Sequence, residues 1–343
     1  MKHRAFSLLE VAVASSIAAI ISTAAISTFA MINKQVVRMK GASVASDHAK
    51  SVIDLLTSDL QGIGGGAIRP WMALHVVDDG TASRADEFNP AVGGPVKPDR
   101  LTYATAIPGV PTCVVTGPAP ADPPAALDEV QVAGEGSCCL DAIFDAREPG
   151  AAAQAFLIKG TSYRQITLHT SPTACAVKIT RGPLYENDRP EPGENWVGAE
   201  VVAARVRTIY LTEDRELRMY RETESTDAAP TNSASENIRL AGNVVDFQVQ
   251  LGYDINGDGS LLDATTNDDE WRYNVVGDTA TMAGFREDAL RMIGVGVIVA
   301  QPVNDPTYVS TAAIVGSSPI EGPRLQLRAA MGKVALRNLF VFF

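Results

Sequence analysis

The longest uncharged apolar stretch of the chain covers residues 11–32. A helix over these residues would be about 33 Å long, enough to cross a hydrocarbon core of about 30 Å. Farther on, apolar residues recur at steps of three and four, which predicts that the helix continues as an amphipathic rod to about Gln61. The stripe consists of Val44, His48, Val52, Ile53, Leu56, Leu60 and Ile63. The helix is ended by Gly62, Gly64, Gly65 and Gly66. We interpret the stripe as a core face that packs under a head.

The second half of the chain shows the two-residue period of antiparallel strands. From Val245 to Tyr253, apolar residues alternate with Asp246, Gln248 and Gln250, which predicts a half-buried strand. Further strands are expected at 293–299, at 201–211 and 217–221 as a hairpin, and at 325–338. Residues 90–126 are rich in proline and predict a long loop with one short strand at about 100–106. The sequence thus predicts an α+β fold: a long N-terminal transmembrane helix packed on a head with antiparallel β-sheet.

One acidic residue, Glu10, lies at the edge of the apolar stretch, after a short basic segment that contains Lys2 and Arg4. A charged side chain at the centre of a bilayer costs about 2.5 to 3.5 kcal/mol on insertion scales, so such residues usually mark a pairing or functional site. A secretory signal peptide would have a shorter apolar core followed by a small-residue cleavage site. The span is therefore expected to remain in the mature protein.

The segment Ala5-Phe6-Ser7-Leu8-Leu9-Glu10-Val11 resembles the class III leader and N-methylation site of type IV prepilins and pseudopilins. The resemblance implies that a membrane-bound prepilin peptidase cuts between Ala5 and Phe6, and that the new amino terminus is methylated. Ala5 stands where the family usually has glycine. The chain then divides into a leader (1–5), a helix with a transmembrane half (6–62) and a head (63–343). The alternative, an uncleaved signal anchor, leaves Glu10 unexplained.

In an apolar environment the carboxylate of Glu10 needs a partner of opposite charge, and the N-terminal amine of a neighbouring subunit would supply one. Assembly would then neutralise the charge. Basic residues stand on both sides of the span, Lys2 and Arg4 before it and Lys34, Arg38 and Lys40 after it, so they do not settle its orientation.

Several later segments resemble the PilW-like minor pilins, a branch related to the type II secretion pseudopilin J. These segments are 52–60 at the end of the helix, 208–211 before a hairpin, 243–254 and 334–338. The resemblance implies a subunit that primes type IV pilus assembly with other minor pilins and the major pilin, at or near the tip, and that presents a tip adhesin. It also implies an inner-membrane protein with a periplasmic head before assembly, and a pilus at the cell surface afterwards.

Two other functions stay open at this point. One is a type II secretion minor pseudopilin that supports protein export. The other is a signal-anchored, calcium-dependent surface-binding module.

The formal net charge of −11 argues against nucleic acid as a partner. Enzyme signatures are not found: the glycines at 62–66 lack the lysine of a phosphate loop, and Gly316-Ser317-Ser318 lacks the closing glycine of a nucleophile elbow. We therefore expect a structural protein.

Four cysteines, Cys113, Cys138, Cys139 and Cys175, lie in the exported head, where disulfides persist. Adjacent cysteines rarely bond to each other, because the peptide between them strains the ring. Cys138 and Cys139 are thus expected to bond to Cys113 and Cys175, in either of two pairings. A zinc site is not expected from their spacing and the scattered histidines.

The segment 254–260 has the first half of a calcium loop. Its oxygen donors are Asp254, Asn256, Asp258 and the backbone carbonyl of Ser260, and Gly259 permits the sharp turn. Thr265 occupies the twelfth position, where a bidentate glutamate belongs. The shell would have to be completed by Asp263 or by one of Asp268, Asp269 and Glu270. The alternative is a solvated acidic turn, for which Asn-Gly and Asp-Gly are equally suited.

Overall fold

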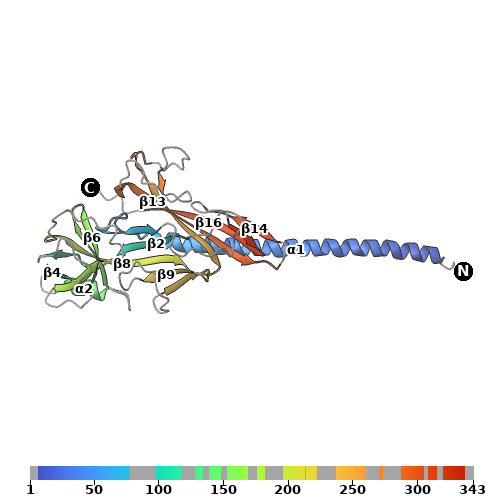
Figure 1. Cartoon of the computed structure of the whole chain (residues 1–343), viewed down its shortest axis with the longest axis horizontal. Coiled ribbons are helices and arrows are strands. Elements are labelled where there is room, and N and C mark those ends of the chain that lie inside the picture. The colour runs from blue at the N-terminus through green and yellow to red at the C-terminus, as the bar shows by residue number, and fades with distance from the viewer. Residues whose placement is uncertain are drawn as a thin grey trace.

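The structure is a computed structural model, and it describes residues 7–77, 98–116, 128–133, 139–147, 153–168, 176–181, 196–212, 214–221, 237–259, 261, 270–272, 287–304, 308–314 and 320–336. A long helix, α1 (Leu8–Leu60), runs from the N-terminal end into a head of antiparallel β-strands, and about half of it projects from the head (Figure 1). The predicted α+β fold is confirmed.

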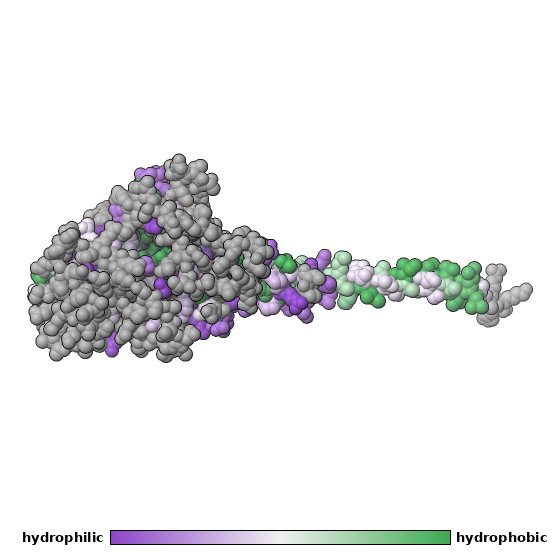
Figure 2. All heavy atoms as spheres, in the orientation of Figure 1, coloured by the Kyte–Doolittle hydropathy of each residue, from purple (hydrophilic) through white to green (hydrophobic). Residues whose placement is uncertain are grey.

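The two halves of α1 differ in their surroundings. The projecting half is exposed and largely apolar (Figure 2), and Phe29, for example, is 73% exposed. Among the described residues, α1 is the one helix long and apolar enough to cross a membrane. The buried residues of α1 all lie in its second half: Ala45, Ala49, Val52, Ile53, Leu56 and Leu60. The helix is therefore an apolar rod at one end and a core element at the other.

The buried stripe of α1 differs from the predicted one at its start. Val44 is 46% exposed, whereas the smaller Ala45 and Ala49 are buried. Small residues let the helix axis approach the head closely, and a Cβ atom added at Gly41 would lie 4.0 Å from a methyl group of Val303. The prediction for Val44 was wrong because a periodicity argument gives weight to large apolar residues rather than to small ones at a close approach.

A four-stranded antiparallel sheet packs against this half of the helix. Its order is β12 (Trp271–Arg272), β11 (Val244–Tyr253), β13 (Leu290–Pro302) and β16 (Leu325–Ala335), and the 3₁₀ turn η2 (Glu287–Ala289) leads into β13. A separate hairpin of β14 (Val309–Ala312) and β15 (Ile320–Pro323) lies beside it, near the projecting helix (Figure 1). The strands predicted at 293–299 and 325–338 are thus present.

The strand β11 is buried on both faces, which corrects the prediction of a half-buried strand. Asp246 is 0% exposed, and Gln248 and Gln250 are each 3% exposed. Glycines leave room for the covering side chains: a Cβ atom at Gly252 would lie 3.2 Å from the Trp271 ring. The side-chain Nε2 of Gln248 donates to Asp246 Oδ1 over 3.0 Å, so polar side chains on this face bond to each other. Alternation of polar residues therefore did not mean exposure to water.

Within the part of the chain that the structure describes, the other sheet has ten strands, all antiparallel to their neighbours. They are β1 (Leu74–Val77), β2 (Arg100–Ala106), β3 (Cys113–Val115), β4 (Asp128–Ala133), β5 (Ala153–Lys159), β6 (Ser162–Leu168), β7 (Ala176–Arg181), β8 (Glu200–Leu211), β9 (Leu217–Arg221) and β10 (Asn237–Ala241). The predicted strand at 100–106 and the predicted hairpin of β8 and β9 are both present. The strand β3, in contrast, lies inside the segment predicted to be loop.

Six of these strands close into a ring. The pairings run β8–β3, β3–β4, β4–β7, β7–β6, β6–β5 and back from β5 to β8. We call this ring, together with the short helix α2 (Cys139–Asp145), the distal barrel, because it lies at the end of the head opposite the projecting helix (Figure 1). Closure gives each of the six strands a paired neighbour on both sides.

The distal barrel has a core of its own. Its buried residues include Val115, Leu140, Ile143, Leu157, Ile166, Leu168, Ile179, Trp196 and Val201. A larger core joins the second half of α1 to both sheets. The strand β8 belongs to both units, since Val201 and Ala203 contribute to the barrel core whereas Val206 and Ile209 contribute to the main core. One long strand therefore connects the distal barrel to the part of the head that holds the helix.

Candidate functional site: the projecting helix and its attachment to the head

The N-terminal end of α1 is closed by a capping box. The Glu10 amide donates to the Ser7 hydroxyl over 3.2 Å, and the Ser7 amide donates to Glu10 Oε2 over 2.9 Å. Two of the amides that a helix start leaves without partners are thereby satisfied. Glu10 therefore has a local role in the single chain in addition to the expected pairing between subunits. Ala5 and Phe6, the predicted processing residues, lie outside the described residues.

The hydroxyl groups of the projecting half are also satisfied within the helix. Ser16 and Thr23 each donate to the carbonyl four residues earlier, over 2.8 Å in both cases. Ser15, Ser27 and Thr28 likewise bond to carbonyls of the preceding turn over 2.9 to 3.0 Å. A lipid phase offers no water to polar groups, so internal bonding of this kind suits a membrane span.

A charged cluster fixes the other end of α1 to the head. Asp59 Oδ1 lies 2.9 Å from Arg207 NH1, on β8, and Asp59 Oδ2 accepts the hydroxyl of Tyr103, on β2. Asp59 and Arg207 are only partly exposed, at 32% and 18%. The sequence alone does not reveal this cluster, because an aspartate beside an apolar stripe gives no sign of partners so distant in sequence. The helix is thus tied to the same strand that enters the distal barrel.

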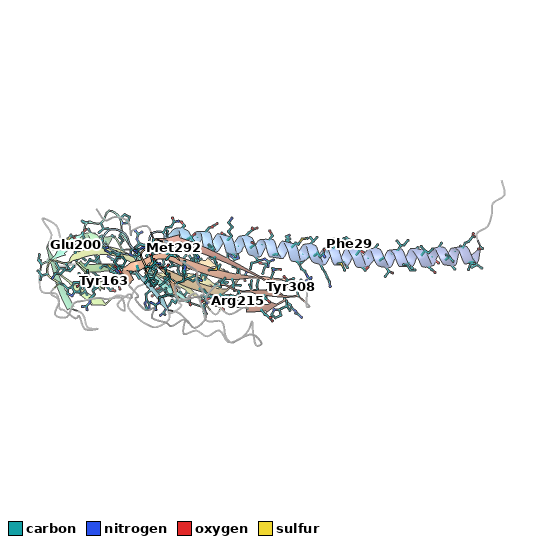
Figure 3. All side chains as sticks on the ribbon, turned by 90° about the horizontal axis from the view of Figure 1, so that it is seen from above. Phe29, Tyr163, Glu200, Arg215, Met292 and Tyr308 are labelled. Carbon is teal, nitrogen blue, oxygen red and sulfur yellow. A yellow bond between two sulfur atoms is a disulfide. The ribbon has the colours of Figure 1, made fainter. Side chains whose placement is uncertain are left out.

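A second contact holds α1 where it enters the head. The guanidinium carbon of Arg38 lies 5.1 Å from the centre of the Tyr308 ring, a cation–π distance. Tyr308 precedes β14, and its hydroxyl donates to the side chain of Gln326. In Figure 3 Tyr308 lies at the end of the head next to the bare helix, with Phe29 farther out. Arg38 is therefore part of the attachment as well as a basic residue that flanks the apolar stretch.

An ion-pair group lies at the turn of the β8–β9 hairpin. Glu216 Oε2 accepts from Arg218 at 2.6 and 2.9 Å, and Glu216 Oε1 lies 3.1 Å from Arg239 on β10. The hydrogen bonds from Arg218 hold the pKa of Glu216 below its usual value, with a smaller effect from the charge of Arg239. The group links β9 to β10.

Cys113 and Cys139 form a disulfide, with their Cα atoms 5.9 Å apart. The bond joins the start of β3 to the start of α2 and so fixes the helix of the distal barrel to its wall. Of the two pairings left open by the sequence, the structure has the one in which Cys139 bonds to Cys113. Cys138 and Cys175 lie outside the described residues.

The predicted calcium loop forms a tight turn after β11. The Asp258 amide donates to Asn256 Oδ1 over 2.9 Å, and Asp254 Oδ1 accepts from Gly259 over 3.4 Å. Gly257 and Gly259 have φ angles of 76° and 77°, which few other residues adopt. The described part of the segment is thus a turn, which agrees with the predicted calcium loop and with its alternative, a solvated acidic turn.

The surroundings of this loop include one favourable and one unfavourable feature for a cation. Glu270 reaches its base, where Oε1 accepts the amide of Ile255 over 3.1 Å, whereas Arg291 Nε lies 3.7 Å from Asp254 Oδ2. No group of three or more His, Cys, Asp or Glu side chains that could hold a metal occurs in the part of the chain that the structure describes. Ser260 and Asp263 lie outside that part, so calcium binding stays a prediction.

Comparisons of the chain with protein-family models, curated proteins and solved structures gave no match. The class of protein therefore follows from the architecture alone. A long N-terminal apolar helix, bare in its first half and packed against antiparallel β-sheets in its second, is a pilin-like architecture.

Proposed function

We propose that this chain is a minor pilin of the PilW-like branch, which primes type IV pilus assembly and sits at or near the pilus tip. The observation that carries the proposal is the bare half of α1, whose large apolar side chains, such as Leu9, Ile17 and Phe29, are more than half exposed in the single chain. A surface of this kind is not stable in water and needs lipid or other subunits around it. The inner membrane would cover it before assembly, and the helices of the major pilin and other minor pilins would cover it in the filament.

The attachment of the head supports a role in a filament. The helix is fixed at two levels, by Arg38 with Tyr308 and by Asp59 with Arg207. A force applied to the helix would therefore be transmitted to the head. The distal barrel lies at the opposite end, where a tip subunit would face outward (Figure 1). In this proposal the distal barrel presents a tip adhesin or contacts the next minor pilin.

The test is a deletion strain complemented with the wild-type chain. We expect the deletion to lower the number of surface pili, and we expect sheared pili of the complemented strain to contain small amounts of a protein that begins at Phe6. If pili are unchanged and protein export falls, the chain belongs to a type II secretion system. If the protein retains residues 1–5 and neither phenotype appears, both assembly functions fail and a signal-anchored surface module remains.

A further inference from the structure

The end of the head that faces the projecting helix lies close to the membrane in the proposed anchored state, on which this inference rests. We define the proximal rim as Tyr308 together with the β14–β15 hairpin. Arg38, which contacts Tyr308, follows the apolar stretch by six residues, or about 9 Å of helix. Each headgroup layer of a bilayer is about 5 to 7 Å thick, outside a core of about 30 Å. The rim therefore begins near the outer surface of the headgroups.

The charge of the helix at this level is positive. The sequence has no acidic residue between Glu10 and Asp47, although the whole chain carries a net charge of −11. Lys34 lies one helical turn before Arg38 and thus on the same face, which places it directly beneath the rim. Lys40 lies two residues after Arg38 and so on the opposite face of the helix.

The rim exposes one large apolar side chain, and its described residues carry little net charge. Val309, next to Tyr308, is 56% exposed. The described charged residues of the hairpin and the turn after it are Glu321 and Arg324, which balance each other. Transmembrane helices are tilted by about 20° on average, and a tilt toward the rim would bring Val309 closer to the lipid headgroups.

We propose that the proximal rim rests on the membrane surface before assembly, with Lys34 bound to the headgroups of anionic phospholipids and Val309 in contact with lipid. Positive charge near an anionic leaflet is favourable, and each lysine there changes the local binding equilibrium about fivefold. The head is then held against the membrane at a defined height rather than free to swing on the helix. Extraction into a filament has to break this contact.

The test uses tryptophan fluorescence of the full chain in phospholipid vesicles whose acyl chains carry bromine, a quencher, near the headgroup. Val309→Trp adds a fluorophore at an already exposed site, and Phe29→Trp is the matched control within the span. The parent chain, with Trp71, Trp196 and Trp271, gives the background. Vesicles are made of phosphatidylcholine alone or mixed with phosphatidylglycerol.

We expect Phe29→Trp to be quenched in both kinds of vesicle, and Val309→Trp to be quenched more strongly when phosphatidylglycerol is present. Adding Lys34→Gln should remove most of the quenching at Val309→Trp, whereas Lys40→Gln should leave it nearly unchanged. If Phe29→Trp escapes quenching, the anchoring itself fails. If Phe29→Trp is quenched and Val309→Trp is not, only the rim contact is overturned, and a rim covered by a second copy of the chain would give this result.

An independent measurement covers the case in which Val309→Trp does not fold. Backbone hydrogen exchange of residues 309–312 in the otherwise unaltered chain should be slower in mixed vesicles than in phosphatidylcholine. In the mixed vesicles, Lys34→Gln should raise this exchange rate about fivefold. Equal exchange in both lipids would overturn the proposal, provided that residues 8–32 are protected in both.

Discussion

At the scale of single residues, Glu10 has an observed capping contact and a proposed assembly role, and the two can be separated chemically. Its side chain accepts a hydrogen bond from the Ser7 amide within the same chain. In the proposed function its charge also pairs with the N-terminal amine of a neighbouring subunit. Glutamine at this position keeps the acceptor of a capping box and loses the charge, whereas alanine loses both. The two substitutions therefore distinguish a local role from an assembly role.

We expect Glu10→Gln to insert normally and to assemble as poorly as Glu10→Ala, because the partner amine of the neighbouring subunit would lose its counter-charge in both variants. Pilus counts and crosslinking to other pilins measure assembly, and membrane fractionation checks insertion. Ser7→Ala is the matched control, since it removes half of the capping box and keeps the charge. If Glu10→Gln assembles like the wild type while Glu10→Ala and Ser7→Ala fail, helix capping rather than charge pairing is what matters.

Two glycines at the helix–sheet contact should respond to alanine with opposite signs. A Cβ atom at Gly332, on β16, would lie 2.6 Å from methyl groups of both Ile53 and Thr57 on α1, so Gly332→Ala must push the helix away and is expected to cost about 1 to 3 kcal/mol. At Gly41 the nearest atom is 4.0 Å away, and a helical Gly→Ala exchange gains up to about 1 kcal/mol. Melting temperatures of the two variants give the signs. A rise for both would mean that helix and strand are not in close contact at Gly332.

At the scale of elements, the distal barrel is held by a disulfide that spans 26 residues of sequence. We expect mass mapping without reductant to find the Cys113–Cys139 bond and, as a prediction from the even number of cysteines, a Cys138–Cys175 bond. Replacing Cys113 and Cys139 by serine should lower stability by about 3.5 kcal/mol in the chain-entropy model. Hydrogen exchange should then accelerate in β5 and β6 and stay unchanged in residues 45–60. A Cys113–Cys138 peptide would contradict the assignment.

Calcium binding by the loop after β11 can be tested by adding calcium and by removing it with a chelator. Calcium should raise the melting temperature, since a ligand bound only by the folded state stabilises it by about 2.7 kcal/mol at a hundredfold excess over Kd. Asp258→Ala should abolish the rise, and Arg291→Gln should enlarge it, because Arg291 Nε lies 3.7 Å from Asp254 Oδ2 and competes with a cation. A melting temperature that ignores calcium, chelator and both substitutions would show that the loop is only a turn.

Much of the element order could be predicted from sequence because it depends on local pattern. The helix, the β8–β9 hairpin and the strand β2 follow from periodicity and turn residues. Pairing between distant segments could not be predicted in this way. The ring closure of β8 with β5 brings Leu157 opposite Val201, and nothing in either strand specifies the other. The hairpin of β5 and β6 does have a local signal in the sequence, a two-residue turn that begins with Gly160, whose φ is 62°.

In the candidate site, too, features that depend on local sequence could be predicted and contacts between distant segments could not. Glu10 was found because a charge beside an apolar span is unusual in any sequence, and the capping box needs only residues three apart. Asp59, in contrast, contacts Arg207 across 148 positions, and its role depends wholly on the fold. Burial of Asp246 on β11 likewise depends on side chains brought by other strands, so alternation along β11 alone suggested an exposed face.

At the scale of the whole molecule, the two halves of α1 have different surroundings, and the second half is part of the core of the head. The first half of α1 carries exposed apolar residues, whereas the second half supplies Val52, Ile53, Leu56 and Leu60 to the main core. That core in turn reaches the distal barrel through β8. Removing the first half should thus leave the fold intact, and removing the second half should affect the whole head.

We therefore expect a fragment of residues 34–343 to be soluble and to unfold cooperatively, and a fragment of residues 62–343 not to fold. Burying each large side chain contributes about 1.5 to 3 kcal/mol, so the four residues together contribute about 6 to 12 kcal/mol. That is comparable to the whole stability of a typical domain, about 5 to 15 kcal/mol. Circular dichroism during heating compares the fragments, and Leu56→Ala in the longer one should lower its stability by about 2 to 5 kcal/mol. Were the shorter fragment to melt at the same temperature as the longer one, the second half of α1 would be an attachment to the head and not part of its core.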